Sequence, residues 1–522
     1  MASRGAAWMT LAGEAAKSML APGDHCTVMD RMRRLAPAVA PLLALAAMLA
    51  APSVGSAPRR IPAPPLPAVF DAAPGGAPLA PAQLDHWWLL FADPALNTLE
   101  DEAFRNGPDA RAAAARVLEA TATRDSQIAQ TLPKGTIEGL ASKQHQSNLG
   151  SGGSALFPIG GDYESESLNL KVSWEIDLFG RLREARKVAK ADLAATRFNI
   201  EGARAALAAT VADTYFQAAG LTIQIADAAE TVRIQTELRG VAQQKADLGL
   251  AAASDADRVS ADLSQAQGQL QDLQSQLHTA RRQLLILVGR ANAPVEGLIL
   301  PADVAVAPAP PVTLPSDLLA RRPDVRESEQ RLRAALGTSR LRHLAIFPTV
   351  SILPQLGISR TVQPSVGFNP NSKALFPIQQ ATSLGFTAWG GGISVPFFDI
   401  PQLLFEAKAE DARTRQAAIA YEKTVETAYG EAENALVSLE AARRAAAVLA
   451  DGEARAHRAS EAARTRYSMG LDDLNSTLSA EQAWRSTRAA LTSERVQSLR
   501  RAVTTYKALG GGWAYATLAK AP

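Results

Sequence analysis

The sequence predicts a mainly α-helical protein made of long antiparallel coiled-coil helices, with a few β-strands added. Aromatic residues make up only 5% of the 522 residues, which favours thin layers of small side chains over a thick core. Two stretches, 159–293 and 402–521, contain no proline, a residue nearly excluded from helix interiors. Outside the helices that these stretches predict, short segments alternate apolar and polar residues, as strands do.

The N-terminal region has the pattern of a secretory signal peptide. An apolar run at 35–51 follows three arginines and is followed by small residues at 53–57, so we expect cleavage after Ser56. Prolines and the short length of the run make an uncleaved anchor the weaker reading. The single cysteine, Cys26, precedes the apolar run, which excludes it as the lipid-bearing residue of a lipoprotein.

Composition argues against several classes of protein. The 54 basic and 52 acidic residues give a net charge of +2, without the positive field of a nucleic-acid binder. The six histidines are scattered without metal-ligand spacing, and one cysteine forms no internal disulfide. No Ser/His/Asp or paired-carboxylate arrangement stands out. We therefore predict no enzyme, no cofactor and no metal.

The first long helical pair is predicted from an apolar seam. Apolar residues from Ala256 to Leu287 recur at alternating spacings of three and four, which indicates a heptad seam on a helix of about 50 Å. An alanine-rich stretch at 182–247 predicts a second helix. Because only a short break containing Gly249 separates the two, they are expected to form an antiparallel hairpin.

The second half repeats this plan. Helices are predicted at 403–467 and 474–509, with a break at Gly470. The pairs Gly249-Leu250 and Gly470-Leu471 thus occupy matching breaks, which indicates an internal duplication. The predicted parts are an extension with signal peptide at 1–56, a Pro/Ala-rich segment at 57–84, repeats at 85–313 and 314–513, and a tail at 514–522.

Each half also contains a predicted strand pair. Leu168, Leu170, Val172 and Trp174 alternate with polar residues, and 136–142 is the predicted partner across a Gly/Ser-rich loop at 145–164. The second half offers 350–359 and 384–397, separated by a long polar loop. A sheet with one apolar and one polar face is typical of a membrane β-barrel. Four strands are too few to close such a barrel. Because open edges are prohibited in hydrocarbon, several copies must pool their strands.

Several ungapped strings resemble the TolC/NodT-type outer-membrane efflux proteins. They are HWWLLFADPALNTLEDEAF at 86–104, VSWEIDLFGRLR at 172–183, LPSDLLARRPDVRESEQRLRAA at 314–335 and YKALGGGW at 506–513. The resemblance implies a homotrimer with a 12-stranded transmembrane β-barrel, four strands per chain, continued by a coiled-coil α-barrel in the periplasm. It also implies an exit duct in contact with outer-membrane lipid, a periplasmic adaptor and an inner-membrane transporter. The nearest branch serves resistance-nodulation-division pumps, which export drugs and other small amphiphiles.

The chain departs from this family at three places. It lacks the acylated cysteine common in that branch, and it has Phe398-Asp399-Ile400-Pro401-Gln402 where an FDGGR-like turn is usual. Ser479 replaces an aspartate that forms the inner constriction in relatives, and Arg258 takes the matching position of the first hairpin.

The hairpin tips are the predicted functional sites. We expect the adaptor to dock at Gly249, Leu250, Gly470 and Leu471. Arg466, Asp472 and Asp473 flank Gly470 and, with Ser479, form the predicted periplasmic gate. One of the two aspartates is alternatively a helix cap.

Two alternative functions remain from the sequence: a duct for type I protein secretion, and a soluble periplasmic coiled-coil scaffold. For Trp87 and Trp88, packing within the helical part is favoured over a membrane role. Arg321 and Arg322 are expected to be structural.

Overall fold

The computed structural model describes residues 65–71, 84–146, 161–249, 252–301, 303, 306–309, 315–372 and 374–513. The predicted signal peptide, Cys26, Leu250 and the predicted tail from residue 514 lie outside the described residues. Among the described helices, none combines the length and the apolar character needed to span a bilayer.

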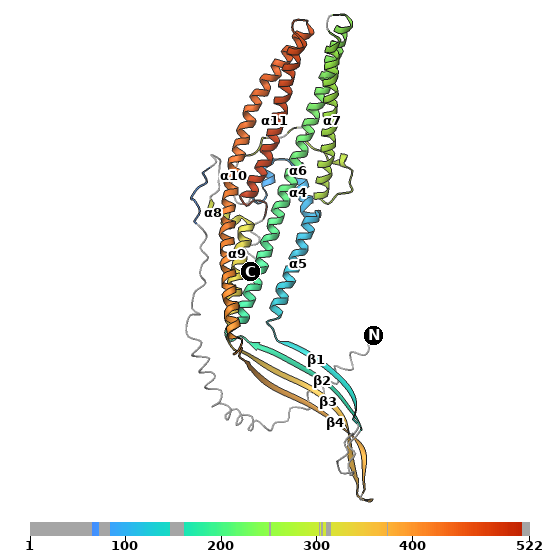
Figure 1. The fold of residues 1–522 in the computed structure, drawn as a ribbon, viewed down its shortest axis with the longest axis vertical. Coiled ribbons are helices and arrows are strands. Elements are labelled where there is room, and N and C mark those ends of the chain that lie inside the picture. Colours follow the sequence, from blue (N-terminus) through green and yellow to red (C-terminus); the bar gives the residue numbers. More distant parts are fainter. Residues whose placement is uncertain are drawn as a thin grey trace. The chain divides into compact units, whose positions relative to one another are not determined.

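The two halves of the chain share one order of elements (Figure 1). The first half contains η1 (Trp87–Phe91), α4 (Pro94–Asn106), α5 (Pro108–Ala129), β1 (Lys134–Gln146), β2 (Gly161–Ile176), α6 (Arg181–Asp247), α7 (Ala253–Leu287) and η2 (Val295–Gly297). The second contains α8 (Pro315–Arg321), α9 (Pro323–Leu344), β3 (Thr349–Asn369), β4 (Ala374–Ser394), α10 (Ile400–Ser468) and α11 (Leu474–Ala508). The order of two helices, two strands and a long helical hairpin therefore occurs twice.

The long helices begin and end close to the predicted residues, and the predicted α7 seam is largely buried. Its buried members are Ala256, Val259, Leu263, Ala266, Leu277, Ala280 and Leu284. At the start of α6, the Asp177 carboxylate accepts hydrogen bonds from the backbone N–H groups of Leu182 and Arg183, at 3.0 Å each. This carboxylate satisfies donors that a helix start otherwise leaves unpaired.

The largest core cluster lies where η1 packs against α6 and α11. Trp87 is fully buried, and its ring is stacked on Tyr506 with centroids 5.9 Å apart. Trp88 and Phe91 are buried in the same cluster. The prediction that Trp87 and Trp88 are packing residues is therefore confirmed.

The segment Gly510–Trp513, here called the C-terminal clasp, closes this core. Gly510 has a φ of 78°, which favours glycine, and ends α11. The Gly512 N–H donates to the Leu84 carbonyl at 3.0 Å, and Trp513 Nε1 donates to the Arg321 carbonyl at 2.7 Å. A Cβ on Gly511 would lie 2.8 Å from the Leu84 carbonyl oxygen. Glycine is therefore needed here for close packing.

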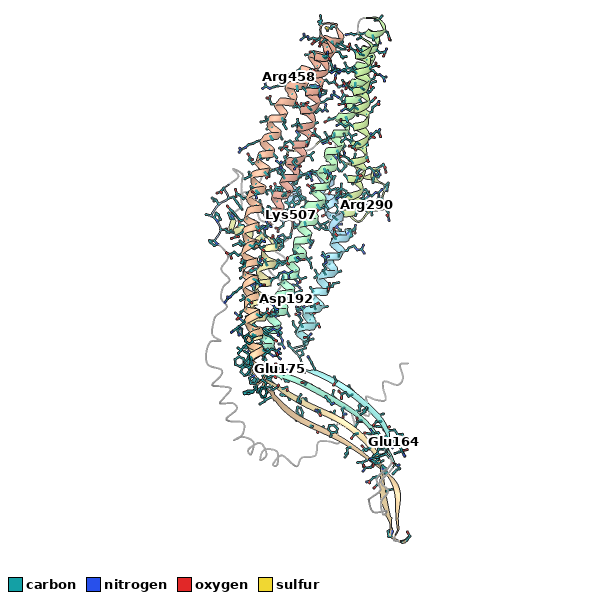
Figure 2. All side chains as sticks on the ribbon, viewed as in Figure 1. Glu164, Glu175, Asp192, Arg290, Arg458 and Lys507 are labelled. Atoms are coloured by element: carbon teal, nitrogen blue, oxygen red, sulfur yellow. The ribbon has the colours of Figure 1, made fainter. Side chains whose placement is uncertain are left out.

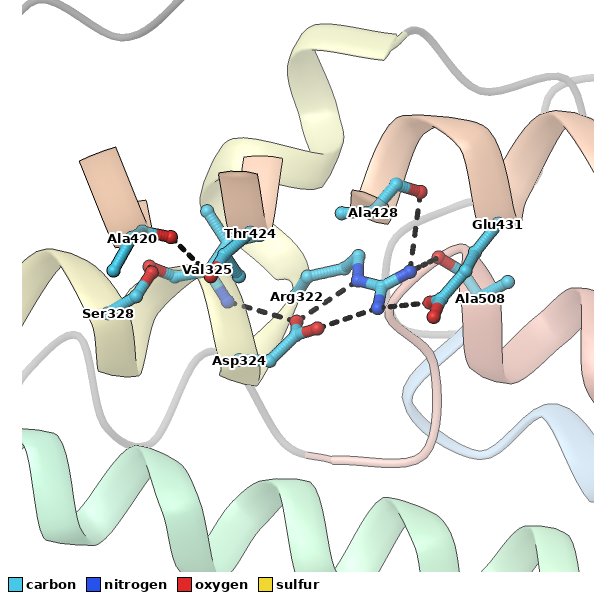
Figure 3. A network of polar contacts seen from close by, with 9 residues as sticks. All are labelled: Arg322, Asp324, Val325, Ser328, Ala420, Thr424, Ala428, Glu431 and Ala508. Carbon is cyan, nitrogen blue, oxygen red and sulfur yellow. Dashed lines mark hydrogen bonds and ion pairs between the residues drawn. The ribbon is translucent and has the colours of Figure 1, made fainter. Parts of the chain in front are cut away.

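The chain breaks between α8 and α9 at Arg322. Arg322 is extended (φ −75°, ψ 122°) because Pro323 disfavours the helical conformation in the residue before it. The buried Arg322 guanidinium pairs with Asp324 and Glu431, both at 2.6 Å, and donates to the Ala428 and Ala508 carbonyls (Figure 3). Arg322 thus joins α9 to α10 and α11, which agrees with its predicted structural role.

The four strands form one antiparallel sheet in the order β1-β2-β3-β4 (Figure 1). Strand pairing extends as far as the pair of Gln146 with Gly161 and the pair of Asn369 with Ala374. Parts of the two predicted loops therefore belong to strands. Backbone hydrogen bonds hold these extensions, where side-chain alternation is too weak to predict a strand. Conversely, Val395–Phe397, predicted as strand, is a turn in which Phe397 N–H donates to the Val395 carbonyl at 2.9 Å.

Candidate functional site

The sheet has one apolar and one polar face, because directly paired residues of antiparallel strands point to the same side. The apolar face carries Ile137, Leu168, Leu170, Val172, Trp174, Val350, Ile352, Leu356, Ile358, Trp389 and Ile393. The polar face carries Thr136, Glu138, Ser165, Ser167, Asn169, Lys171, Ser173, Ser351, Gln355, Ser359, Thr361 and Thr382. Trp389 is 83% exposed, so an apolar environment outside this chain is needed to cover the apolar face.

The apolar face becomes charged towards the strand ends remote from the helices. Arg360 pairs with Glu166 at 3.8 Å, and Lys143 pairs with Glu164 at 2.9 Å. Glu164 lies near one end of β2 and Glu175 near the other (Figure 2). The apolar residues therefore form a band with a charged border, which suits a hydrocarbon layer that meets water.

The two hairpin tips have the same glycine geometry. Gly249 and Gly470 have φ values of 73° and 77°, the left-handed conformation that glycine adopts without strain. No atom lies within 4 Å of a Cβ built on either glycine. The neighbouring Leu248, Met469 and Leu471 are 73%, 67% and 68% exposed. Both tips therefore present apolar side chains on an open turn.

The residues of the predicted gate surround the second tip. Arg466 Nε lies 3.7 Å from Asp472 Oδ2, within the same hairpin. Asp473 is the N-cap of α11, since its Oδ1 accepts from the Ser476 N–H at 2.8 Å. Ser479 is exposed on α11. Of the two aspartates, Asp473 thus takes the capping role and Asp472 the ion pair.

Contacts that the sequence did not predict connect the two hairpins of the chain near their tips. Lys245 Nζ donates to the Tyr467 carbonyl at 3.0 Å and lies 3.7 Å from the centroid of the Tyr467 ring. Arg258 donates to Asn475 Oδ1 at 2.6 Å. The sequence singled out Arg258 as the counterpart of Ser479, but it gave no signal for Lys245 or for the partners of either residue. These links, rather than Arg466–Asp472, join one hairpin to the other.

A layer of fully buried polar side chains lies in the tip-side part of the hairpins. Gln235 on α6 and Glu481 on α11 have no exposed surface, and neither side chain has a hydrogen-bond partner. Thr477 is also fully buried. Burial raises the pKa of Glu481, against the opposing effects of the Arg485 and Arg464 guanidinium groups. Unsatisfied buried polar groups cost free energy, so this layer weakens the packing of the hairpins.

A cavity of about 510 Å³ lies between the first hairpin and α11 in the same region. Its charged lining includes Arg258, Asp262, Arg485 and Arg488. Arg488 pairs with Asp227 on α6 at 2.5 Å. Polar contacts therefore accompany a buried apolar cluster that joins the two hairpins in this region and includes Ile234, Val259 and Leu478.

In the described part of the chain, no three His, Cys, Asp or Glu side chains are grouped as metal ligands. The described residues form a two-faced sheet and two joined helical hairpins.

A family profile described as "Outer membrane efflux protein" matches residues 99–290 and 314–511. Among curated relatives, the pyoverdine export outer membrane protein OpmQ of Pseudomonas aeruginosa is 28% identical over 439 residues, which cover 83% of this chain and 88% of OpmQ. The toluene efflux pump outer membrane protein TtgC of Pseudomonas putida is 27% identical, with 82% and 85% covered. The cation efflux system protein CusC of Escherichia coli is 25% identical, with 87% and 94% covered.

Solved structures show the same fold. The outer-membrane channel OprN superposes with a TM-score of 0.74 at 26% identity, covering 87% of this chain and 99% of OprN. The Campylobacter jejuni outer membrane channel CmeC superposes with a TM-score of 0.70 at 19% identity, covering 89% and 94%.

Proposed function

The chain belongs to the outer membrane efflux protein family and resides in the outer membrane with its helical part in the periplasm, and we propose that it is the passive exit duct of a tripartite efflux pump. The observation that carries the proposal is the two-faced sheet, whose apolar band suits lipid and whose polar face suits water. The duct supplies a path, and the inner-membrane transporter supplies the energy.

The proposed working unit is a homotrimer. In the described chain β1 and β4 are the edges of a four-stranded sheet. Each unpaired backbone group at such an edge costs several kcal/mol in hydrocarbon. Three copies joined edge to edge give a 12-stranded β-barrel without edges, continued by a coiled-coil α-barrel from the helical hairpins. We assign the two repeats to 85–313 and 314–513, supported by the duplicated order of elements.

The exposed tips are the proposed docking sites for the periplasmic adaptor. Gly249, Gly470 and Leu471 form open turns with apolar neighbours, while Leu250 belongs to the proposal from its sequence position. The proposed gate consists of Arg466, Asp472, Asp473 and Ser479. The links at Lys245 and Arg258 hold the hairpins together, and adaptor contact at the tips would compete with them.

The proposed cargo is a drug or another small amphiphile. The test has two parts: conductance of the purified protein in planar lipid bilayers, and accumulation of an amphiphilic dye in cells that lack the gene. We expect a conducting channel, and dye accumulation that falls when the gene is restored. A protein that does not conduct contradicts the duct. Conduction combined with unchanged dye accumulation and loss of a secreted protein would point to protein secretion instead.

A further inference from the structure

Three large apolar side chains lie around the Ser167–Ser359 pair on the polar face of the sheet, while Leu353 and Ile378 lie farther along the same face. Leu140 on β1 pairs with Ser167, Ser167 with Ser359, and Ser359 with Leu384 on β4, so all four side chains point to the polar side. Phe386 lies two residues from Leu384 on the same side. Leu140, Leu384 and Phe386 are 64%, 62% and 41% exposed. These three residues are here called the apolar shelf.

The Phe386 ring has a defined seat on this face. Phe386 pairs with Gly357, and a Cβ built on Gly357 would lie 2.6 Å from Phe386 Cζ. The same Cβ would also collide with the Asn169 side chain on β2. The ring therefore crosses β3 above a residue without a side chain. Gly357 is needed at this position because any larger residue would displace the ring.

The surroundings of the shelf carry little net charge. Its nearest neighbours on the polar face are the serines Ser167 and Ser359. Further along the same face, Lys171 Nζ lies 2.6 Å from Glu138, so these two charges compensate each other. An approaching molecule therefore meets apolar side chains on a surface that is rich in hydroxyl groups. The electrostatic field there is too weak to select ions by charge.

We propose that the apolar shelf is a contact site for the apolar part of an exported small amphiphile. This inference rests on the proposed function, in which the polar face lines the lumen of the trimer. Because β4 of one copy adjoins β1 of the next, Leu384 and the partner's Leu140 lie on neighbouring strands, and the shelf is completed between copies. Contact with three side chains is weak enough for release, which conduction requires.

The test compares two blocking ions of equal charge in planar bilayers. Tetraphenylphosphonium offers a large apolar surface and tetramethylammonium a small one. Each is added on the side reached by the β3–β4 hairpin, so that it meets the shelf without passing the helical tips. We expect tetraphenylphosphonium to reduce the wild-type current at lower concentration. In Leu384→Ser/Phe386→Ser its half-blocking concentration should rise about tenfold, because apolar contact area is lost.

Two further variants serve as controls. Phe386→Leu keeps an apolar side chain and should retain most of the block. Leu118→Ser removes a leucine that is 73% exposed on α5, away from the sheet, and should leave the block unchanged. Equal block by both ions in the wild type, or unchanged block in the double variant, would contradict the proposed contact site but not the proposed exit duct. A wild-type protein without conductance overturns the duct and the shelf with it.

Discussion

We predict that the burial of Glu481 makes the packing of the hairpins sensitive to pH. Its side chain is fully buried without a hydrogen-bond partner, and the charged groups that act on it are Arg485 on its own helix, Arg464 on α10 and Asp262 on α7. Burial raises the pKa of Glu481 above its ordinary value of 4.5. The folded state therefore holds this proton more tightly than the unfolded state, and stability falls as the pH rises above 4.5 towards the raised value.

We predict that Glu481→Gln removes this loss. The variant should match the wild type near pH 4.5 and unfold at a temperature a few degrees higher at pH 7.5, because glutamine cannot ionise and so avoids the cost of burying a charge. Thermal unfolding followed by circular dichroism at both pH values measures this. Glu461→Gln, at a carboxylate that is 62% exposed, is the control and should show no pH-dependent gain. An equal shift at both pH values would contradict the titration.

The C-terminal clasp gives a second prediction for single residues. Gly511→Ala would place a Cβ 2.8 Å from the Leu84 carbonyl oxygen and 2.9 Å from that of Tyr506. Overpacking against backbone atoms should cost about 1–3 kcal/mol of unfolding free energy. Gly268→Ala on α7 is the matched control, because no atom lies within 4 Å of its Cβ. There, alanine should stabilise the helix by up to about 1 kcal/mol. Urea unfolding measures the change in unfolding free energy for both variants. Equal changes would contradict the role given to Gly511 in the C-terminal clasp.

Among the elements, the two hairpins are joined near their tips by polar contacts that lie beside a buried apolar cluster. Lys245→Ala removes both the hydrogen bond to the Tyr467 carbonyl and the contact with its ring. Asp472→Ser removes a partly exposed ion pair, a kind of contact worth about 0–1 kcal/mol, and hydrogen bonds from the Asp473 N–H and the Ser476 hydroxyl, all within one hairpin. We predict a clear rise in single-channel conductance for Lys245→Ala and little change for Asp472→Ser.

Asp473→Ser is the control for this comparison, because serine retains the capping ability while removing the charge. Its conductance and stability should equal those of the wild type. If Asp472→Ser changed the conductance more than Lys245→Ala, the ion pair at the Gly470 turn would be the gating contact instead.

Sequence reasoning succeeded where one periodic pattern decides the structure. The α7 seam and the proline-free stretches gave the long helices to within a few residues, and the alternation around Leu168 gave a strand. It failed where pairing is decided by the partner strand, as in the extensions of β3 and β4. It also missed Lys245–Tyr467, since a contact between residues so distant in sequence leaves no local signal. The burial of Glu481 was missed for the same reason.

For the whole molecule, the open edges of the sheet predict the oligomeric state. Protein solubilised in detergent should contain three copies, because only closure satisfies β1 and β4 in hydrocarbon. Light scattering with correction for bound detergent measures the protein mass. Proline substitutions in the middle of β4 should reduce the trimer, whereas an exposed helical substitution such as Leu118→Ser should leave it intact. A monomer that still conducts would falsify the shared barrel.

The C-terminal clasp also bears on how the chain is made. The Gly512 N–H donates a hydrogen bond to the Leu84 carbonyl, so this contact forms only after nearly the whole polypeptide has been synthesised. Joining such distant segments requires closure of a very long loop, which places the step late in folding. Until then Gly511 and Gly512 do not cover Trp87, and an unfinished chain exposes the indole ring of this residue. Quality-control proteases that recognise exposed aromatic surface would thereby distinguish truncated from complete chains before assembly.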